Sequence, residues 1–459
     1  MPGAEKSRTK APSVAFYGNK INDGRAEVLK WARDSLVTLT TVSAGESWDD
    51  LQVLGEVIRG ATIVGLSEGV HYAAEPLEFR NRVFEYLVKE EGFTAIAIES
   101  GIVESRLVHD YVRGEPGDLR SIMAEGLSWT FDRLPQNESL IRWMRGYNAD
   151  PRHKSKIDFY GFDVSGSPGN AAANRGVEAA LIEALKYLEV VDAAAAARFR
   201  GRLGSLLTNL RFDLFHPGKS PGYDSLSQSE RDALTGVIGD LLTLLERREA
   251  QFMANSSPAD YEWACRAAIG ARQADSWLRE TPVAWRPSSK SFEFPGEHID
   301  FLSAASDVRD RAQADNLEWI VGQQGSAGKI LVYASRYHLS TAPLSSAWWS
   351  QQHATAGTYL RRRFGNRLVT IGNLIGSGEF GDGASGHSAI EAPPESIDGI
   401  AKEVGKPLFL LDLRLAPIPI ARWLSEEHQF GGGSEALRMS VSGAFDVLFY
   451  VDRVRPACS

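Results

Sequence analysis

The sequence predicts an α/β protein in which a largely parallel central sheet is flanked by helices and carries an inserted helical lobe. Short apolar runs of strand length alternate with segments of helical periodicity, which is typical of βαβ units around a buried sheet. From about residue 171 to 281 the strand signals disappear, and the chain becomes rich in Ala, Leu, Arg and Glu. A composition of 43% hydrophobic and 24% charged residues is that of an ordinary globular protein.

The predicted strands share a length of four to six residues and a high content of β-branched or aromatic side chains. In chain order they are residues 61–66, 94–98, 157–162, 329–333, 368–371 and 407–411. A helix is expected between the first two strands. Pro76 suits its first turn, where the missing N–H is not needed, and the helical pattern continues to about Glu90.

The segment without strands has its own helical signals. Ser227, followed three residues later by Glu230, resembles a capping box, and an apolar stripe at helical spacing continues behind it. The stripe consists of Leu234, Ile238, Leu241, Leu242 and Leu245. We therefore expect three parts: residues 1–170 as the first half of the α/β core, 171–298 as the inserted lobe, and 299–459 as the second half of the core.

Charge and composition argue against several classes of partner. A formal charge of -9 disfavours nucleic-acid binding, which needs Lys and Arg to neutralise phosphates. No apolar run of about 18 residues suggests a membrane span, and the N-terminus lacks the apolar core of a signal peptide. The two cysteines, Cys265 and Cys458, are not spaced as in a zinc site or a disulfide framework. We expect a cytoplasmic protein that acts on a small molecule and uses no metal or cofactor; the oligomeric state stays open.

Residues 65–80 combine two carboxylates, an imidazole and a guanidinium directly after a predicted strand. Glu68 and His71 should lie at the carboxyl end of the sheet, where ligands usually bind. Arg80 falls on an apolar helix face, so its charge needs a carboxylate or a bound anion, and Glu99, at the end of the next strand, is its expected partner. Such a group of side chains can activate water and stabilise an oxyanion.

Simpler interpretations exist for the same residues. His71 can be a hydrogen-bonding loop residue, and Glu68 and Glu99 can form structural salt bridges with Arg80. Asp163, after the strand 157–162, either lines the crevice or caps the next helix.

A second candidate segment follows the strand 329–333. His338 is a possible second acid or base, whereas Ser335 lacks the Gly-x-Ser-x-Gly elbow of a serine nucleophile. We expect Ser335, Arg336, Asp163 and Trp129 to contact the substrate. A serine hydrolase of the triad type is disfavoured.

At several places the chain resembles the erythromycin esterase-like family. The most specific match is the Glu-x-x-His of Glu68 and His71 followed by Arg80. Further matching segments are residues 92–99, 143–148, 159–163, 309–311 with 316–319, and 445–452. Together they cover both halves of the core, whereas the lobe matches in helical character alone.

The resemblance implies hydrolysis of an ester, typified by the opening of a macrolide lactone in a secondary metabolite such as an antibiotic. His71 would be the general base that activates water, Glu68 and Glu99 would orient or charge-balance the site, and Arg80 would hold the substrate or the oxyanion. The sequence departs from the family pattern in two places. Ser335 and Arg336 replace a histidine and an asparagine of Ala-His-Asn-x-His, and Ser67 replaces a glycine.

These departures leave two alternatives open. In one, the same site catalyses cyclisation, elimination or acyl transfer in natural-product biosynthesis. In the other, the scaffold is a non-catalytic small-molecule binding protein, with Trp348 and Trp349 as possible walls of a pocket.

Overall fold

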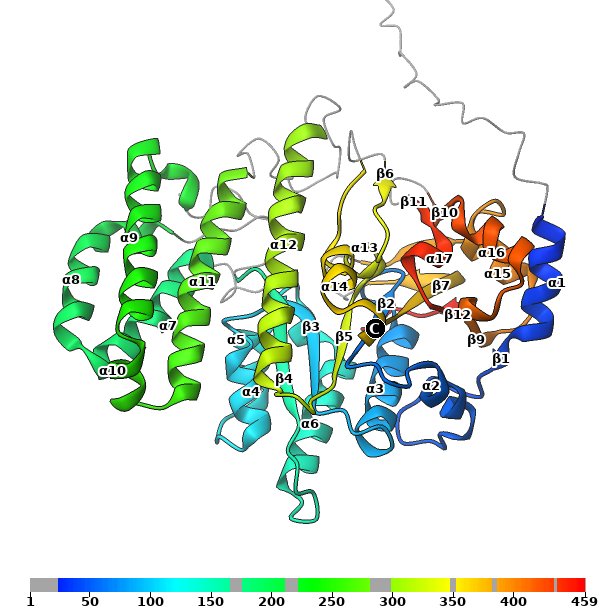
Figure 1. Cartoon of the computed structure of the whole chain (residues 1–459), viewed down its shortest axis with the longest axis horizontal. Coiled ribbons are helices and arrows are strands. Elements are labelled where there is room, and N and C mark those ends of the chain that lie inside the picture. The colour runs from blue at the N-terminus through cyan, green and yellow to red at the C-terminus, as the bar shows by residue number, and fades with distance from the viewer. Residues whose placement is uncertain are drawn as a thin grey trace, which may run out of the picture.

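The computed structural model describes residues 24–165, 176–210, 222–280, 299–346, 352–381, 386–432 and 436–458. In these residues one nine-stranded sheet forms the centre, with helices on both faces and a group of helices to one side (Figure 1). The strands of this sheet are β1 (Val37–Thr38), β2 (Ile63–Glu68), β3 (Ala95–Gly101), β4 (Asp158–Asp163), β5 (Ile330–Ser335), β7 (Leu368–Phe380), β8 (Ser388–Glu391), β9 (Leu408–Asp412) and β12 (Val447–Val454). A small antiparallel sheet contains β6 (Ser345–Ser346), β10 (Glu427–Phe430) and β11 (Leu437–Ser440).

The strand order confirms the predicted α/β class. It runs β1-β9-β12-β7-β2-β5-β3-β4, with β8 paired to β7. Pairing is parallel from β12 through to β4, and it is antiparallel where β9 meets β12 and β1 and where β8 meets β7. All six predicted strands are present, the last of them as the antiparallel β9. β5, from the second half of the chain, lies between β2 and β3 of the first half.

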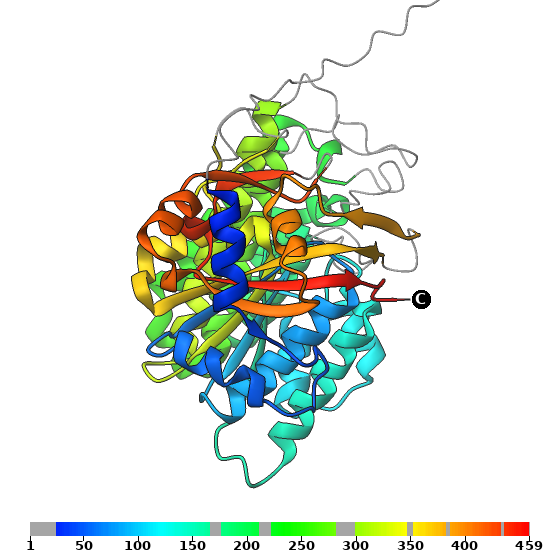
Figure 2. The ribbon, with the colours of Figure 1, turned by 90° about the vertical axis from the view of Figure 1, so that its right-hand side faces the viewer.

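Helices cover both faces of this sheet. The helices before β4 are α1 (Arg25–Ser35), α2 (Gln52–Val57), α3 (Ala74–Lys89), α4 (Arg106–Arg113), α5 (Leu119–Gly126) and α6 (Pro135–Ala149). After the lobe come α12 (Ile299–Gln323), α13 (Arg336–Leu339), α14 (Ala356–Phe364), α15 (Ile397–Glu403), α16 (Ile418–Ser425) and α17 (Val441–Ala444). Pro76 lies in the first turn of α3, as predicted. In Figure 2, α1 (dark blue) lies in front of the orange and red strands of the C-terminal half.

The helical lobe lies between β4 and α12 in the chain. Its helices are α7 (Gly176–Val191), α8 (Ala193–Leu203), α9 (Gln228–Arg247), α10 (Glu249–Ala254) and α11 (Pro258–Glu280). The described parts of this stretch, 176–210 and 222–280, contain no strand, as expected. The capping box of Ser227 and Glu230 at the start of α9 is confirmed, and the apolar stripe behind it is buried.

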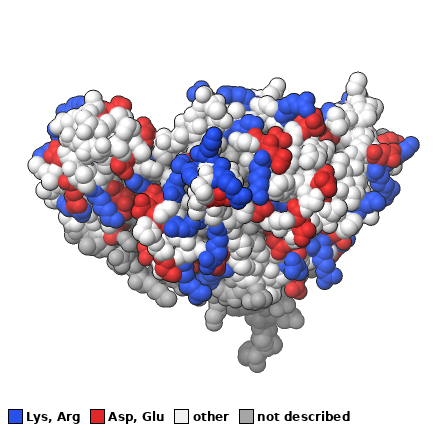
Figure 3. Space-filling view, turned by 90° about the horizontal axis from the view of Figure 1, so that it is seen from below, with Lys and Arg blue, Asp and Glu red and all other residues white. Residues whose placement is uncertain are grey.

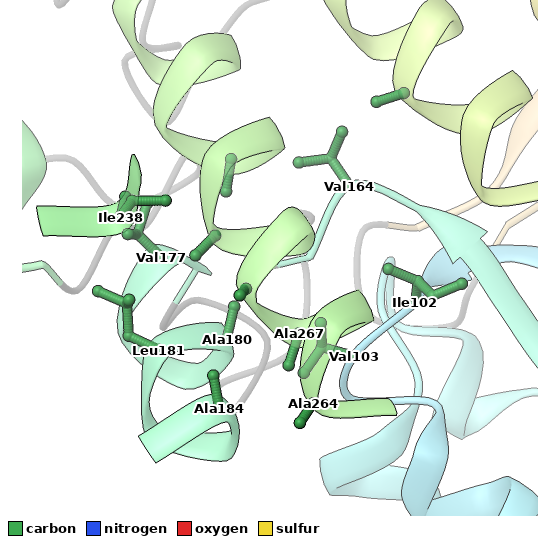
Figure 4. Close-up of a cluster of buried hydrophobic side chains, with 14 of the residues drawn as sticks. Ile102, Val103, Val164, Val177, Ala180, Leu181, Ala184, Ile238, Ala264 and Ala267 are labelled. Carbon is green, nitrogen blue, oxygen red and sulfur yellow. The ribbon is translucent and has the colours of Figure 1, made fainter. Parts of the chain in front are cut away.

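A continuous apolar core joins the lobe to the sheet. Ile102 and Val103 follow β3, Val164 follows β4, and all three pack with small side chains such as Ala180 of α7 and Ala267 of α11 (Figure 4). The expected boundaries at 170/171 and 298/299 fall within or at the edge of residues 166–175 and 281–298, which lie outside the described residues. The three-part division therefore stays a prediction.

The described residues include no helix that is both long enough and apolar enough to cross a membrane. Seen from below, the surface carries acidic and basic side chains intermixed, so neither sign of charge covers that face (Figure 3).

Candidate active site

The first part of the site is the turn between β2 and α3. Glu68 is buried at the end of β2, and its Oε1 lies 2.6 Å from Nδ1 of His71. Its other oxygen, Oε2, accepts a hydrogen bond of 2.7 Å from the hydroxyl of Tyr333 on β5. The side chain of His71 is 39% exposed, so the imidazole is held on its Nδ1 side and reachable from solvent. The structure thus brings Glu68 and His71 together at the carboxyl end of the sheet.

The backbone of this turn is unusual. Tyr72, directly after His71, has a φ of 63°, and Trp129 and Thr130 have φ values of 62° and 60°. Non-glycine residues rarely adopt this left-handed region, and such conformations cluster at functional sites. The Tyr72 hydroxyl donates a hydrogen bond of 2.7 Å to the carbonyl of Trp129, which ties the two segments together.

The charge of His71 follows from its neighbours. Burial lowers the pKa of the imidazole, but the charge and hydrogen bond of Glu68, and then the charge of Glu99, outweigh this and raise the pKa to about 9. His71 is therefore mostly protonated at neutral pH when no ligand is bound.

The two glutamates lie on opposite faces of the sheet, because side chains alternate along a strand. Leu66 shares a face with Glu68, and both lie on the side of Tyr333 and α3. On β3, Ile98 belongs to that same side, so the next residue, Glu99, points to the opposite face, where α12 lies.

Arg80 is not the partner of Glu99, and this prediction was wrong. Arg80 is 1% exposed, and its Nε and Nη2 donate to Oδ1 of Asn81 at 3.0 and 2.8 Å. Its guanidinium lies 4.9 Å from the ring centroid of Tyr333, the residue that donates to Glu68. Arg80 and Glu99 extend from opposite faces of the sheet, which explains the error.

The partner of Glu99 is Arg309 of α12. Nη2 of Arg309 donates to Glu99 Oε1 at 2.8 Å, and the backbone N–H of Ser335 donates to Oε2, also at 2.8 Å. Burial raises the pKa of the Glu99 carboxyl, but the charge and hydrogen bond of His338, and then the charges of His71 and Arg309, hold it well below its usual range. Glu99 is therefore negatively charged near pH 7.

Asp163 and Trp129 hold the same arginine. Asp163, at the end of β4, accepts from Nε of Arg309 at 3.0 Å and from Nη2 at 2.7 Å, which is a two-pronged ion pair. The Trp129 ring lies 4.7 Å from the guanidinium, and its Nε1 donates to Asp163 at 3.0 Å. Gln313, one turn along α12, also donates to Asp163. Both predicted substrate-contacting residues therefore lie at the site, and their contacts here are with Arg309.

His338 is buried between two carboxylates. Its Nδ1 lies 2.8 Å from Asp310, and its Nε2 lies 3.2 Å from Glu99. Burial lowers the pKa of this imidazole, but the charges of Asp310 and Glu99 raise it to about 9. Both ring nitrogens face acceptors, so both carry protons, and His338 is a fixed cation in this arrangement.

Ser335 and Arg336 differ in their placement. Ser335 caps α13 and bonds Glu99 through its backbone N–H, so it belongs to the site. Arg336 is buried elsewhere: its Nη1 lies 3.0 Å from Asp398 and 3.4 Å from the carbonyl of Asn373. Arg336 thus forms a buried ion pair with Asp398, and its contact with substrate stays a prediction. Trp348 and Trp349 lie outside the described residues.

Sequence reasoning overlooked three members of the site, Arg309, Asp310 and Tyr333. A usable signal existed for the helix, because Arg309, Gln313 and Asn316 place long polar side chains on one face of α12. The described residues contain no group of three or more His, Cys, Asp or Glu side chains arranged to hold a metal ion.

The arrangement combines a solvent-reachable imidazole on a carboxylate with a clamped guanidinium. An imidazole in this position can exchange a proton with a bound molecule, and fixed cations can stabilise an oxyanion without reorganising. Such a site suits general acid–base chemistry on a carbonyl compound.

Comparisons with known proteins place this geometry in context. A family model described as erythromycin esterase matches residues 88–454, a range that includes Glu99, Asp163, Arg309 and His338 and begins after His71. The putative hydrolase YbfO of Bacillus subtilis is 22% identical over 373 residues, which cover 79% of this chain and 76% of the relative. Erythromycin esterase type II of Escherichia coli is 21% identical over 322 residues, 69% of each chain. The solved structure of a mutant of the erythromycin esterase EreC in its open conformation superimposes with a TM-score of 0.67 at 17% identity, covering 92% of this chain and 98% of that one.

Proposed function

The chain belongs to the erythromycin esterase family, and from this premise we propose that it is an enzyme that hydrolyses an ester or lactone with His71 as the general base. The observation that supports the proposal is the contact of 2.6 Å between Glu68 and Nδ1 of His71. Glu68 accepts a hydrogen bond from Nδ1–H of His71, which leaves Nε2 as the nitrogen that can take a proton from water. The substrate class that we propose is a small secondary metabolite with an ester or lactone bond.

The buried carboxylates have supporting roles in this proposal. Glu68 orients His71 and stabilises the imidazolium that forms as water is deprotonated. Tyr333 holds Glu68 through its hydroxyl hydrogen bond, and the guanidinium of Arg80 packs 4.9 Å from the ring of that tyrosine. Glu99 anchors Arg309 and His338, so it organises the cations on the other face of the sheet.

The reaction conserves the charge of the site. Water transfers a proton to His71 as its oxygen attacks the carbonyl carbon, so an imidazolium and an oxyanion appear together. Because the pKa of free His71 is about 9, the neutral base is a minority at pH 7, and turnover should rise with pH until most imidazoles are neutral.

The test compares wild type with His71→Asn and with the control His153→Asn. His153 bonds the carbonyl of Tyr147 and lies outside the proposed site. Enzyme is incubated in H2¹⁸O with a panel of p-nitrophenyl esters and macrocyclic lactones, and mass spectrometry follows ¹⁸O in the acid product. We expect His71→Asn to lose at least about 100-fold in kcat/KM, and His153→Asn to retain it. Wild-type turnover by His71→Asn would refute the assignment of His71 as the general base. Products without ¹⁸O would indicate acyl transfer or cyclisation instead of hydrolysis.

A further inference from the structure

The guanidinium of Arg309 has one nitrogen, Nη1, without a hydrogen-bond partner among the described residues. Its Nε and Nη2 are engaged by Asp163 and Glu99. The side chain remains 19% exposed, against 1% for Arg80. Of these two arginines, Arg309 is therefore the one that can reach a ligand.

The guanidinium is also rigid and permanently charged. The two-pronged pair with Asp163 fixes its plane, and the Trp129 ring at 4.7 Å covers one face. Burial lowers the pKa of Arg309, but the charges of Asp163 and Glu99 raise it above its usual range. A cation held in this way needs no rearrangement when negative charge develops beside it.

His71 and Arg309 both lie beside the segment 129–131, and both interact electrostatically with Glu99. The 129–131 segment contacts both, because Trp129 covers Arg309 and the Phe131 ring lies 6.1 Å from the imidazole of His71. Glu99 bonds Arg309 directly, and its charge raises the pKa of His71. Both side chains therefore lie near Glu99 at the carboxyl end of the sheet, His71 over one face and Arg309 over the other.

We propose that Arg309 is a catalytic residue whose Nη1 donates a hydrogen bond to the carbonyl oxygen of the bound ester and then to the oxyanion. This inference rests on the proposed hydrolase function and assigns to Arg309 the part that the sequence suggested for Arg80. In the first step the water oxygen bonds the carbonyl carbon, the C=O electron pair moves to oxygen, and the proton goes to Nε2 of His71. In the second step the oxyanion reforms C=O, the ester C–O bond breaks, and His71 returns the proton to the leaving alkoxide.

The binding test uses methylphosphonate, a tetrahedral anion that resembles the oxyanion state, so it does not require a known substrate. Its affinity for the full chain is measured by ¹⁹F NMR of protein labelled with 5-fluorotryptophan, with the Trp129 resonance assigned through Trp129→Phe. We expect Arg309→Lys to weaken binding by about 10- to 100-fold, because the lysine keeps the charge and loses the directed N–H. The matched control Arg113→Lys should change it by less than about threefold, because Arg113 makes a similar two-pronged ion pair with Asp158 at the opposite end of β4. Equal affinity of Arg309→Lys and wild type, or no methylphosphonate binding by wild type, would overturn the proposal.

A second measurement needs no variant, in case Arg309→Lys does not fold. Wild-type protein is treated with 2,3-butanedione, which modifies accessible arginines, with and without methylphosphonate, and modified peptides are quantified by mass spectrometry. We expect methylphosphonate to protect Arg309 and to leave the exposed Arg152 unaffected. Equal modification of Arg309 in both samples would reject the inference.

Failure of this inference is distinguishable from failure of the proposed function. If His71→Asn abolishes ester turnover while Arg309→Lys lowers neither kcat nor methylphosphonate affinity, the hydrolase stands and the role of Arg309 is rejected. If wild type binds methylphosphonate through Arg309 and hydrolyses no ester of the panel, the anion site stands and the hydrolase is rejected.

Discussion

The substitution Glu68→Gln tests whether the carboxylate beneath His71 controls the basicity of the site. The glutamine keeps the size and an acceptor oxygen but removes the negative charge 2.6 Å from Nδ1. The charge of Glu68 is the largest influence that raises the pKa of His71 from 6.5 to about 9. Since the imidazole is 39% exposed, solvent screens part of this effect, and we expect the pKa to fall by about one to two units.

This shift has a measurable consequence for the pH profile. At pH 7 the neutral fraction of His71 is roughly 1% with a pKa of about 9, and it rises to between about 10% and 50% after the shift. The profile of kcat/KM between pH 6 and 10.5 should therefore move to lower pH. Its plateau should drop by at least about tenfold, because the imidazolium loses its charged partner.

The assay uses the ester that wild type hydrolyses fastest, together with a direct NMR titration of His71. Glu138→Gln is the matched control, because Glu138 pairs with Arg142 on the exposed face of α6. A profile of Glu68→Gln that coincides with that of wild type would refute the assignment of His71 and Glu68 as a coupled pair.

Three further predictions concern stability. Because folding raises the pKa of His338 from 6.5 to about 9, its protonation should stabilise the fold by roughly 3 kcal/mol below pH 6.5, and this stabilisation should be lost as pH rises through 9. The difference in urea-unfolding free energy between wild type and His338→Gln should therefore shrink with rising pH, and a constant difference would contradict the prediction. Gly161→Ala should destabilise by about 1–3 kcal/mol in thermal unfolding, because the new Cβ lies 2.4 Å from the carbonyl oxygen of Ser100, whereas Gly146→Ala, with open space around it, should be neutral or stabilising. Ser227→Ala should cost about 1 kcal/mol in chemical denaturation by removing the cap of α9, and an unchanged midpoint would argue against that cap.

The strands and the turn of the site were predictable because their signals are local. A strand buried on both faces needs a run of apolar residues, and the polar residues at its end then mark the crevice, as at Glu68 and Glu99. The pairing of Glu99 was not predictable, because it depends on which face of β3 meets α12, an element more than 200 residues away in the chain.

The placement of Arg336 shows a different limit. It stands two residues before His338, so the sequence places both in one candidate site. α13 is a helical turn, and residues two apart on a helix point in different directions. His338 therefore faces Asp310, while Arg336 reaches Asp398 on α15.

The position of β5 determines when this protein can complete its sheet during synthesis. β2 and β3 emerge from the ribosome early, but the strand that pairs with both of them begins at Ile330. Until then their facing edges hold unpaired N–H and C=O groups, and a nascent chain in that state is open to wrong strand partners. If the gene is divided between the two halves of the core, the N-terminal fragment should aggregate when it is made alone. It should become soluble again when the C-terminal fragment is produced with it.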